Sequence, residues 1–147
     1  MVFTSRILGL DYGEKRIGVS ISDPLRITAQ PLSTIQYFSE QNLWEKFDQL
    51  WNKYDIEKVV VGLPLNMNGS FGPSAEKAKI FGDKLKSRFQ IDVEFWDERL
   101  TSAEAEKTIR QFGQKPSKRK EQIDKLATVL ILQGYLDSKS FNKQINE

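Results

Sequence analysis

The 147-residue chain has the length of one ordinary domain and is too short for two well-packed lobes. Its 22 Lys and Arg barely exceed its 20 Asp and Glu, so the net charge of +2 gives only weak support for a polyanionic partner. Because the chain has no Cys and no His, disulfides, thiolate or imidazole metal sites and histidine bases are excluded.

The chain carries no signal of export or membrane insertion. Its start lacks a basic leader followed by a long apolar stretch, and no later apolar run approaches membrane-spanning length. We therefore expect a soluble cytoplasmic protein with no membrane partner. A single domain is expected over residues 1–147, with a frayed tail from about residue 138.

The first third of the chain predicts an antiparallel sheet followed by a helix. Two β-rich runs at 6–11 and 16–22 are separated by a turn-sized gap that contains Gly13, which predicts a hairpin. A third run at 27–35 contains Pro31, which has no backbone N–H, so this strand is expected at an edge or with a bulge. An amphipathic helix is then predicted by apolar residues at three-to-four spacing: Leu43, Trp44, Phe47, Leu50, Trp51 and Tyr54.

The middle of the chain predicts a strand, a helix and another strand. Residues 58–62 form a short, continuous apolar run of the kind found in strands buried on both faces. Pro73 suits the first turn of the following helix. The buried stripe of that helix is expected to contain Ala78, Phe81, Leu85 and Phe89. The next strand is expected at 91–96.

Two helices are predicted after the last strand. Thr101 and Glu104 form a capping box that opens the first helix, and Gly113 can end it. The second is expected from about residue 117 to 136 because its apolar residues follow helical spacing. Antiparallel strands followed by βαβ units predict an α/β fold in which helices cover both faces of one mixed sheet.

Acidic residues occupy four positions that suit a ligand site. Asp11 ends the first strand before a Gly turn, although one Asp there more often makes only a turn. Asp97 and Glu98 end the last strand, at the rim where α/β sheets bind ligands. Neighbouring side chains of a strand point to opposite faces, so one of the two would normally enter the site, and the alternation alone does not show which. Asp124 lies within an apolar helical stripe, where a carboxylate is costly to bury unless it is paired or binds metal.

Considered together, these acids predict a metal site. Three carboxylates cannot lie together uncompensated, because like charges raise one another's pKa. One or two Mg²⁺ ions would relieve the repulsion, and a pair ~4 Å apart would activate water and stabilise a leaving oxygen. The loop at 62–73 could present backbone N–H groups and a helix N-terminus to a phosphate, although a plain connecting loop would look similar.

Several segments of the chain, in order, resemble the YqgF (RuvX) family over nearly its whole length. They are Gly9-Leu10-Asp11-Tyr12-Gly13, Gly62-Leu63-Pro64-Leu65-Asn66-Met67-Asn68-Gly69, Asp97-Glu98-Arg99-Leu100-Thr101-Ser102, and Ile123-Asp124-Lys125-Leu126-Ala127 through Ile131-Leu132-Gln133-Gly134-Tyr135-Leu136. The resemblance implies an RNase H-like fold related to the RuvC resolvases, with a mixed five-stranded sheet. It also implies that Asp11, Glu98 and Asp124 are the catalytic, metal-binding acids, with Glu98 preferred to Asp97 on the resemblance alone.

The leading interpretation is therefore a Mg²⁺- or Mn²⁺-dependent hydrolase of phosphodiester bonds. By resemblance, its expected role is 5′-end processing of pre-16S rRNA in ribosome biogenesis, and the alternative is Holliday junction resolution in DNA recombination and repair. The partner would be structured RNA or branched DNA. The basic residues expected to contact the nucleic-acid backbone are Arg16, Arg99, Lys118 and Arg119.

Two further interpretations stay open at this point. A catalytically silent nucleic-acid-binding module would carry the same acids. Leu-Asp-Tyr-Gly followed by a strand also resembles the first phosphate loop of actin-like kinases, but 147 residues leave no room for their second lobe. The oligomeric state, monomer or homodimer, is not predicted, although a four-way junction would require two active sites and hence a dimer.

Overall fold

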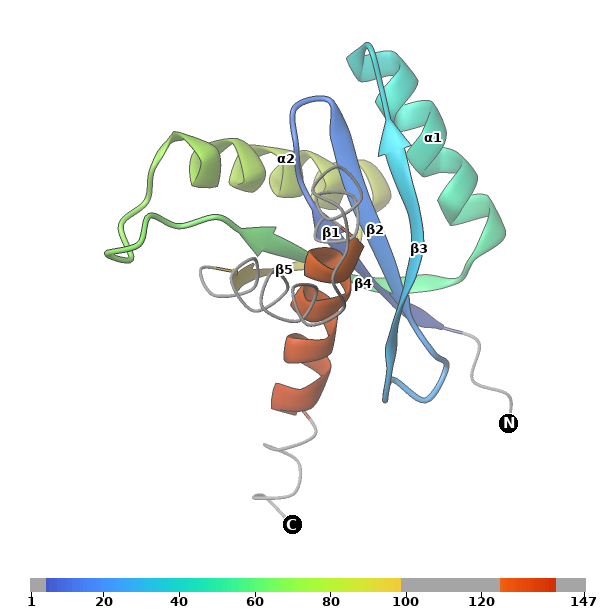
Figure 1. Cartoon of the computed structure of the whole chain (residues 1–147). Helices are drawn as coiled ribbons and strands as arrows, with labels where there is room; N and C mark the ends of the chain where they lie inside the picture. Colours follow the sequence, from blue (N-terminus) through green and yellow to red (C-terminus); the bar gives the residue numbers. More distant parts are fainter. Residues whose placement is uncertain (1–4, 99–124, 140–147) are drawn as a thin grey trace, which may run out of the picture.

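The computed structural model describes residues 5–98 and 125–139, and its strands form one five-stranded sheet in the order β3-β2-β1-β4-β5 (Figure 1). The strands are β1 (Arg6–Asp11), β2 (Arg16–Ser22), β3 (Ala29–Gln36), β4 (Ile56–Leu63) and β5 (Asp92–Asp97). β1, β2 and β3 pair antiparallel, whereas β4 is parallel to β1 and β5 is parallel to β4. The expected α/β fold with a mixed sheet is therefore confirmed.

The edge position of β3 follows from Pro31. The strand pairs only with β2, and the register shifts between Val19 and Ser20, so that Ser20 lies opposite Pro31. A proline has no N–H to donate to a neighbouring strand, which confines it to sheet edges and bulges. The prediction that this strand lies at an edge or carries a bulge is confirmed.

Two helices cover one face of the sheet, α1 (Glu40–Lys53) and α2 (Pro73–Phe89). α1 begins after Ser39, whose hydroxyl accepts a hydrogen bond from the backbone N–H of Asn42 at 3.0 Å. α2 begins with Pro73, which needs no hydrogen-bond acceptor in the first turn. The main core joins these helices to the sheet and includes Leu8, Leu10, Ile17, Val19, Val59, Val61, Leu43, Phe47, Phe81 and Leu85.

The opposite face is covered by the helical segment 125–139, drawn in red in Figure 1. A second cluster of buried residues joins it to the sheet: Ile7, Val60, Ile131, Leu132, Tyr135 and Leu136. Successive strand residues point to opposite sides of the sheet, and helices pack against each side. The expectation of helices on both faces is confirmed. Helix extends to residue 139, one residue beyond the predicted start of the frayed tail. The helix predicted from Thr101 to Gly113, and the start of the last helix, lie outside the described residues.

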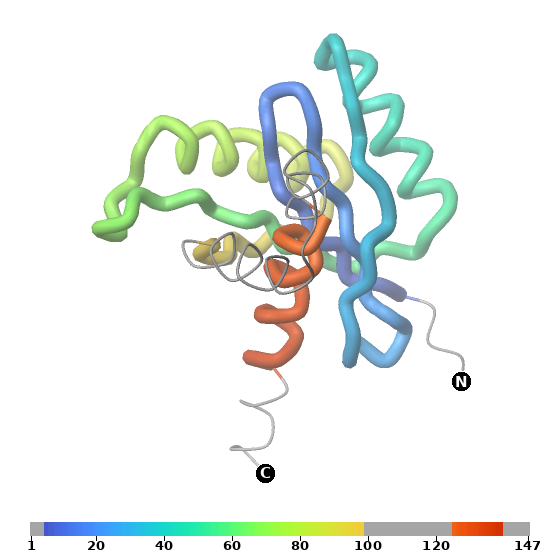
Figure 2. The backbone as a smooth tube through the Cα atoms, in the orientation of Figure 1, coloured from blue at the N-terminus to red at the C-terminus, as the bar shows by residue number. Residues whose placement is uncertain are grey.

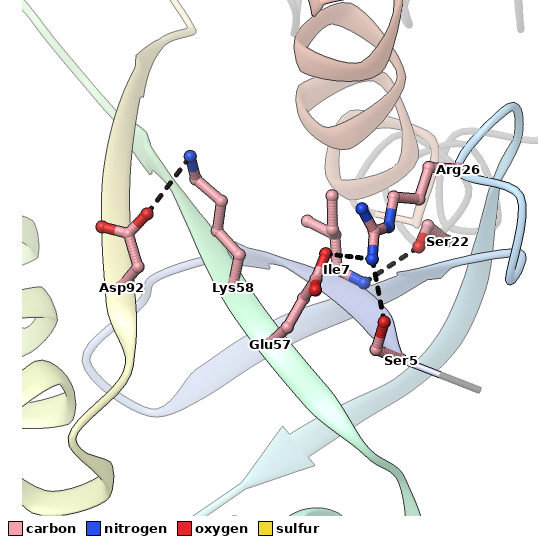
Figure 3. Close-up of polar contacts among 7 residues, drawn as sticks. All are labelled: Ser5, Ile7, Ser22, Arg26, Glu57, Lys58 and Asp92. Carbon is pink, nitrogen blue, oxygen red and sulfur yellow. Dashed lines mark hydrogen bonds and ion pairs between the residues drawn. The ribbon is translucent and has the colours of Figure 1, made fainter. Parts of the chain in front are cut away.

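A group of polar contacts fastens the sheet at the end where β1 begins (Figure 3). The hydroxyl of Ser22 accepts a hydrogen bond from the backbone N–H of Ile7 at 2.9 Å. Arg26 donates to the hydroxyl of Ser5 at 2.8 Å and forms an ion pair with Glu57. These contacts lie at the opposite end of β1 from Asp11, so they hold the scaffold rather than the candidate site.

Lys58 of β4 links this strand to the edge strand β5 and to the helical segment 125–139. Its ammonium lies 3.3 Å from the carboxylate of Asp92, 2.8 Å from that of Glu94, and 5.1 Å from the centre of the Tyr135 ring. Figure 3 draws the ion pair with Asp92. Burial tends to lower the pKa of Lys58, but its hydrogen bonds to Glu94 and Tyr135 outweigh burial and raise that pKa overall. In the part of the chain that the structure describes, no helix is long and apolar enough to span a bilayer.

Candidate active site

Two of the predicted acids lie at the same end of the sheet. Asp11 is the last residue of β1, and Glu98 directly follows β5, with β4 between these two strands. The backbone N–H of Glu98 donates to the carbonyl of Leu63 at 3.3 Å, which holds the residue beside the end of β4. In Figure 2, the β1–β2 turn marks this end of the sheet, and the β2–β3 turn lies at the opposite end. Parallel strands thus bring the two acids to one rim, as ligand sites in α/β sheets require.

Gly62 on β4 provides the space that the Glu98 carboxylate occupies. A Cβ atom at position 62 would overlap the Oε2 atom of Glu98 and would lie 2.6 Å from Cδ1 of Ile131. The carboxylate therefore lies against the backbone of β4, on the face that the segment 125–139 covers. A larger residue at position 62 would displace it.

Asp11 belongs to that same face. Ile7 belongs to the cluster formed with the segment 125–139, whereas Leu8 and Leu10 belong to the cluster on the side of α1 and α2. From Ile7 to Asp11 the pairing of β1 shows no register shift, so the odd-numbered residues of this stretch share one face. Asp11 is therefore directed to the side on which the Glu98 carboxylate lies.

On β5, the same alternation separates the two neighbouring acids. The Phe95 ring lies where a Cβ of Gly82 on α2 would be, while Trp96 packs against Gly134 of the segment 125–139. Asp97 therefore shares the side of Phe95, and Glu98 shares the side of Trp96. Alternation along the sequence did not decide whether Asp97 or Glu98 faces the site. The structure places Glu98 on the same face as Asp11.

The electrostatics of Glu98 are those of a carboxylate that needs a cation. Its pKa is raised from 4.5 to about 8, first by burial and then by the negative charges of Asp11 and Asp97. A divalent cation held between Asp11 and Glu98 would favour the ionised forms of both. Carboxylate oxygens are the ligands that Mg²⁺ and Mn²⁺ prefer, so the residues present fit such an ion.

The third predicted acid, Asp124, lies outside the described residues, as do Arg99, Lys118 and Arg119. The described residues alone bring together no group of three potential metal ligands. Of the four basic residues expected to contact nucleic acid, Arg16 lies within the described residues. It is the first residue of β2, directly after the turn that follows Asp11, and it is exposed.

The segment 125–139 approaches the sheet closely beside Asp11. Gly18 pairs with Asp11 in the β1–β2 register, and a Cβ at Gly18 would overlap the hydroxyl oxygen of the buried Thr128. The hydroxyl of Ser20 donates to the Thr128 carbonyl at 3.1 Å. Sequence reasoning missed the residues of β2 that make this close approach, although Gly18 and Ser20 at alternate positions of β2 carry a signal of it.

The loop between β4 and α2 uses much of its backbone internally. The N–H of Asn66 donates to the Ser70 carbonyl at 3.0 Å, the N–H of Gly69 to the Asn66 carbonyl at 2.8 Å, and the N–H of Ser70 to the side chain of Asn68 at 2.9 Å. These donors hold the loop in shape rather than face a ligand. The suggested contact with a phosphate would therefore have to use the N-terminus of α2.

Comparison with known proteins adds sequence relatives of nearly full length. A family model described as "RuvX: Holliday junction resolvase" matches residues 5–138. A protein of Listeria monocytogenes serotype 4b (strain CLIP80459) named "Putative pre-16S rRNA nuclease" is 50% identical over 135 residues, which are 90% of this chain and 98% of that protein. A protein of the same name from Clostridium botulinum (strain Alaska E43 / Type E3) is 48% identical over 132 residues, with 90% and 96% covered.

Solved structures share the fold at much lower identity. T. thermophilus RuvC in complex with a Holliday junction substrate matches with a TM-score of 0.53 and 13% identity, covering 92% of this chain and 96% of that chain. The Fowlpox virus resolvase in complex with Holliday junction DNA matches with a TM-score of 0.54 and 17% identity, covering 90% and 97%. These likenesses concern the fold alone and confirm the RNase H-like architecture.

Proposed function

Because this chain belongs to the RuvX family, we propose that it is a divalent-metal-dependent nuclease that hydrolyses phosphodiester bonds in nucleic acid. One observation carries the proposal: the carboxylate of Glu98 lies partly buried over Gly62, on the face shared with Asp11, with a pKa raised to about 8. A partly buried acid with a strongly shifted pKa at a sheet rim is typical of a functional site.

In this proposal, Asp11 and Glu98 hold the metal ion from the ends of β1 and β5, and Asp124 is the third ligand. When bound, Mg²⁺ or Mn²⁺ activates water for attack on phosphorus and stabilises the leaving oxygen. Gly62 keeps the carboxylate of Glu98 in place. The nucleic-acid backbone is held by basic residues near the acids: Arg16, Arg99, Lys118 and Arg119.

The substrate we propose is the 5′ end of pre-16S rRNA. The names of the relatives at 48% and 50% identity support pre-16S rRNA as the substrate, because these relatives match nearly the whole chain; the 5′ end rests on the family resemblance. Such a role in ribosome biogenesis would place the protein in the cytoplasm. A second candidate is the four-way DNA junction, which the description of the family model favours. A junction has two strands to cut, so this candidate further requires a homodimer.

The experiment is cleavage of a pre-16S rRNA fragment and of a four-way DNA junction, each with Mg²⁺ and with EDTA. Asp11→Asn, Glu98→Gln and Asp124→Asn are each expected to lower the rate by at least ~100-fold, as loss of a metal ligand should. Asp97→Asn is the matched control and is expected to keep most of the activity. Asp97 lies on the same face of β5 as Phe95, which is the face opposite to that of Glu98.

Cleavage that survives Asp11→Asn unchanged would contradict the proposal. Metal-independent binding without turnover of either substrate would instead favour a silent binding module. The molecular mass in solution separates the two substrates further, since efficient junction resolution by a monomer would contradict the requirement for two active sites.

A further inference from the structure

A cavity of about 870 Å³ lies at the same end of the sheet as Asp11, on the side of α1 and α2. It is lined by the β1–β2 turn, by the connection from β3 into α1, and by both helices. Its volume falls in the range of ligand pockets, ~300–1,000 Å³. The roles assigned above to Asp11 and Glu98 do not use it.

Aromatic rings form one side of the cavity. Tyr12 stacks on Phe81 with ring centres 4.8 Å apart, and Phe81 stacks on Trp44 at 5.8 Å. Phe38, which also lines the cavity, is 89% exposed. An exposed aromatic ring is costly to leave in water and offers a flat surface on which a planar ring can stack.

The charges around the cavity are mainly basic. Four basic side chains line it, against two acidic ones: Lys15, Arg16, Lys77, Lys84, Glu14 and Glu40. Lys77 pairs with Glu14, which ties the β1–β2 turn to α2, and Lys84 pairs with Glu40 at 2.9 Å, which ties α1 to α2. The other two basic residues of the lining, Lys15 and Arg16, lie at the side of the cavity formed by the turn.

The cavity and the acids are neighbours along the chain. Tyr12 follows Asp11 directly, and alternation at the end of β1 sends the two side chains to opposite faces of the sheet. A nucleic-acid strand that crosses this end of the sheet could place one phosphate near the acids while an adjoining nucleotide reaches the cavity.

We propose that this cavity binds an unpaired nucleotide of the nucleic-acid substrate, with its base stacked on Phe38 and its phosphate held by Lys15 and Arg16. The proposal rests on the proposed nuclease function and extends it to the form of the substrate. A base within a duplex is already stacked, so aromatic rings recognise bases that are unpaired. The enzyme would therefore prefer a cleavage site with a single-stranded flank.

The test measures binding of a fluorescein-labelled oligouridylate of about ten nucleotides to the full chain in EDTA, by fluorescence anisotropy. Loss of one stacked base should weaken binding roughly five-fold or more in Phe38→Ala. Leu25→Ala, at the β2–β3 turn, is the matched control: Leu25 is also an exposed apolar residue, at 68%, and its variant should bind as the wild type does.

The phosphate contact has its own readout, the slope of log affinity against log salt. Lys15→Ala should reduce that slope by about 0.7, the value for one phosphate of a single strand. Lys86→Ala, an exposed lysine of α2 outside the cavity lining, should leave it unchanged.

Equal affinities of Phe38→Ala and Leu25→Ala would overturn the proposal. So would unchanged oligonucleotide binding in Phe38→Ala combined with a lower molecular mass in solution, because the cavity would then join two copies of the chain. A failure here is distinct from failure of the nuclease function: cleavage that depends on Asp11 would persist without a nucleotide in the cavity, and binding in EDTA needs no metal-dependent cleavage.

Discussion

Replacing Glu98 by Gln should stabilise the protein at alkaline pH while abolishing cleavage. The carboxylate is partly buried over Gly62 and faces the charges of Asp11 and Asp97; burial first, and then these charges, raise its pKa from 4.5 to about 8. Gln keeps the size and shape of the side chain and removes only its ionisation. The difference in stability between the variant and the wild type therefore reports how much the ionised Glu98 carboxylate destabilises the folded protein.

The sign follows from proton binding in the two states. In the unfolded chain this carboxyl group ionises near pH 4.5, whereas in the folded protein it keeps its proton up to about pH 8. Between these values the folded state binds more protons, so the stability of the wild type falls as pH rises through this window. Below pH 4.5 the group is neutral in both states and the loss is absent; above about pH 8 the loss is complete.

The magnitude follows from the same two values. One pKa unit corresponds to about 1.4 kcal/mol, so the difference between 4.5 and about 8 sets an upper limit of about 5 kcal/mol. Water penetration and local relaxation reduce this limit. We expect Glu98→Gln to raise the free energy of unfolding by about 2–3 kcal/mol at about pH 9 and by less than about 1 kcal/mol at about pH 5.

The assay is urea unfolding of metal-free protein at both pH values, followed by far-ultraviolet circular dichroism. Glu45→Gln, on the exposed side of α1, is the matched control and should change the free energy of unfolding by less than about 0.5 kcal/mol at either pH. A gain for Glu98→Gln that is equal at the two pH values, or absent at the higher one, would refute the reasoning. Mg²⁺ should then stabilise the wild type and have little effect on Glu98→Gln.

Three further substitutions follow from the packing. Gly62→Ala should displace the Glu98 carboxylate and lower the cleavage rate by at least ~10-fold; a rate within two-fold of the wild type, with unchanged circular dichroism, would contradict this. Gly18→Ala should cost about 1–3 kcal/mol because its methyl group would overlap the Thr128 hydroxyl, and Thr128→Ala in the same chain should recover part of that loss; strictly additive urea-unfolding free energies would count against the contact. Lys58→Ala should cost about 1–3 kcal/mol by removing the contacts to β5 and Tyr135, and thermal unfolding at neutral pH with an unchanged midpoint would disprove that role.

Local pattern determined most of the elements. The runs predicted at 6–11 and 16–22 coincide with β1 and β2, because alternation and turn residues act over a few neighbours. Pro31 located the edge strand, since a missing N–H is a property of the residue itself. The apolar spacing of α1 begins at Leu43, but the helix begins at Glu40 because Ser39 caps it, which apolar periodicity does not report.

The candidate site could be predicted only in part. That Asp11 and the acids at the end of β5 meet at one rim follows from parallel strands, which the order of elements already indicated. The space for a carboxylate over Gly62 could not be foreseen, because it depends on how β5 lies beside β4 and on where Ile131 packs. The place of Asp124 stays a prediction.

The sequence by itself determined the strands, the helices that flank them and a set of acids at strand ends. Only the tertiary structure decided that Glu98, and not Asp97, shares a face with Asp11. Because side chains alternate along a strand, Asp97 and Glu98 must point to opposite faces of the sheet. Packing between parts of the chain that are far apart in sequence determines which face of β5 meets the segment 125–139. The cavity beside Tyr12 has the same origin: its walls come from a turn and two helices that only the folded chain brings together.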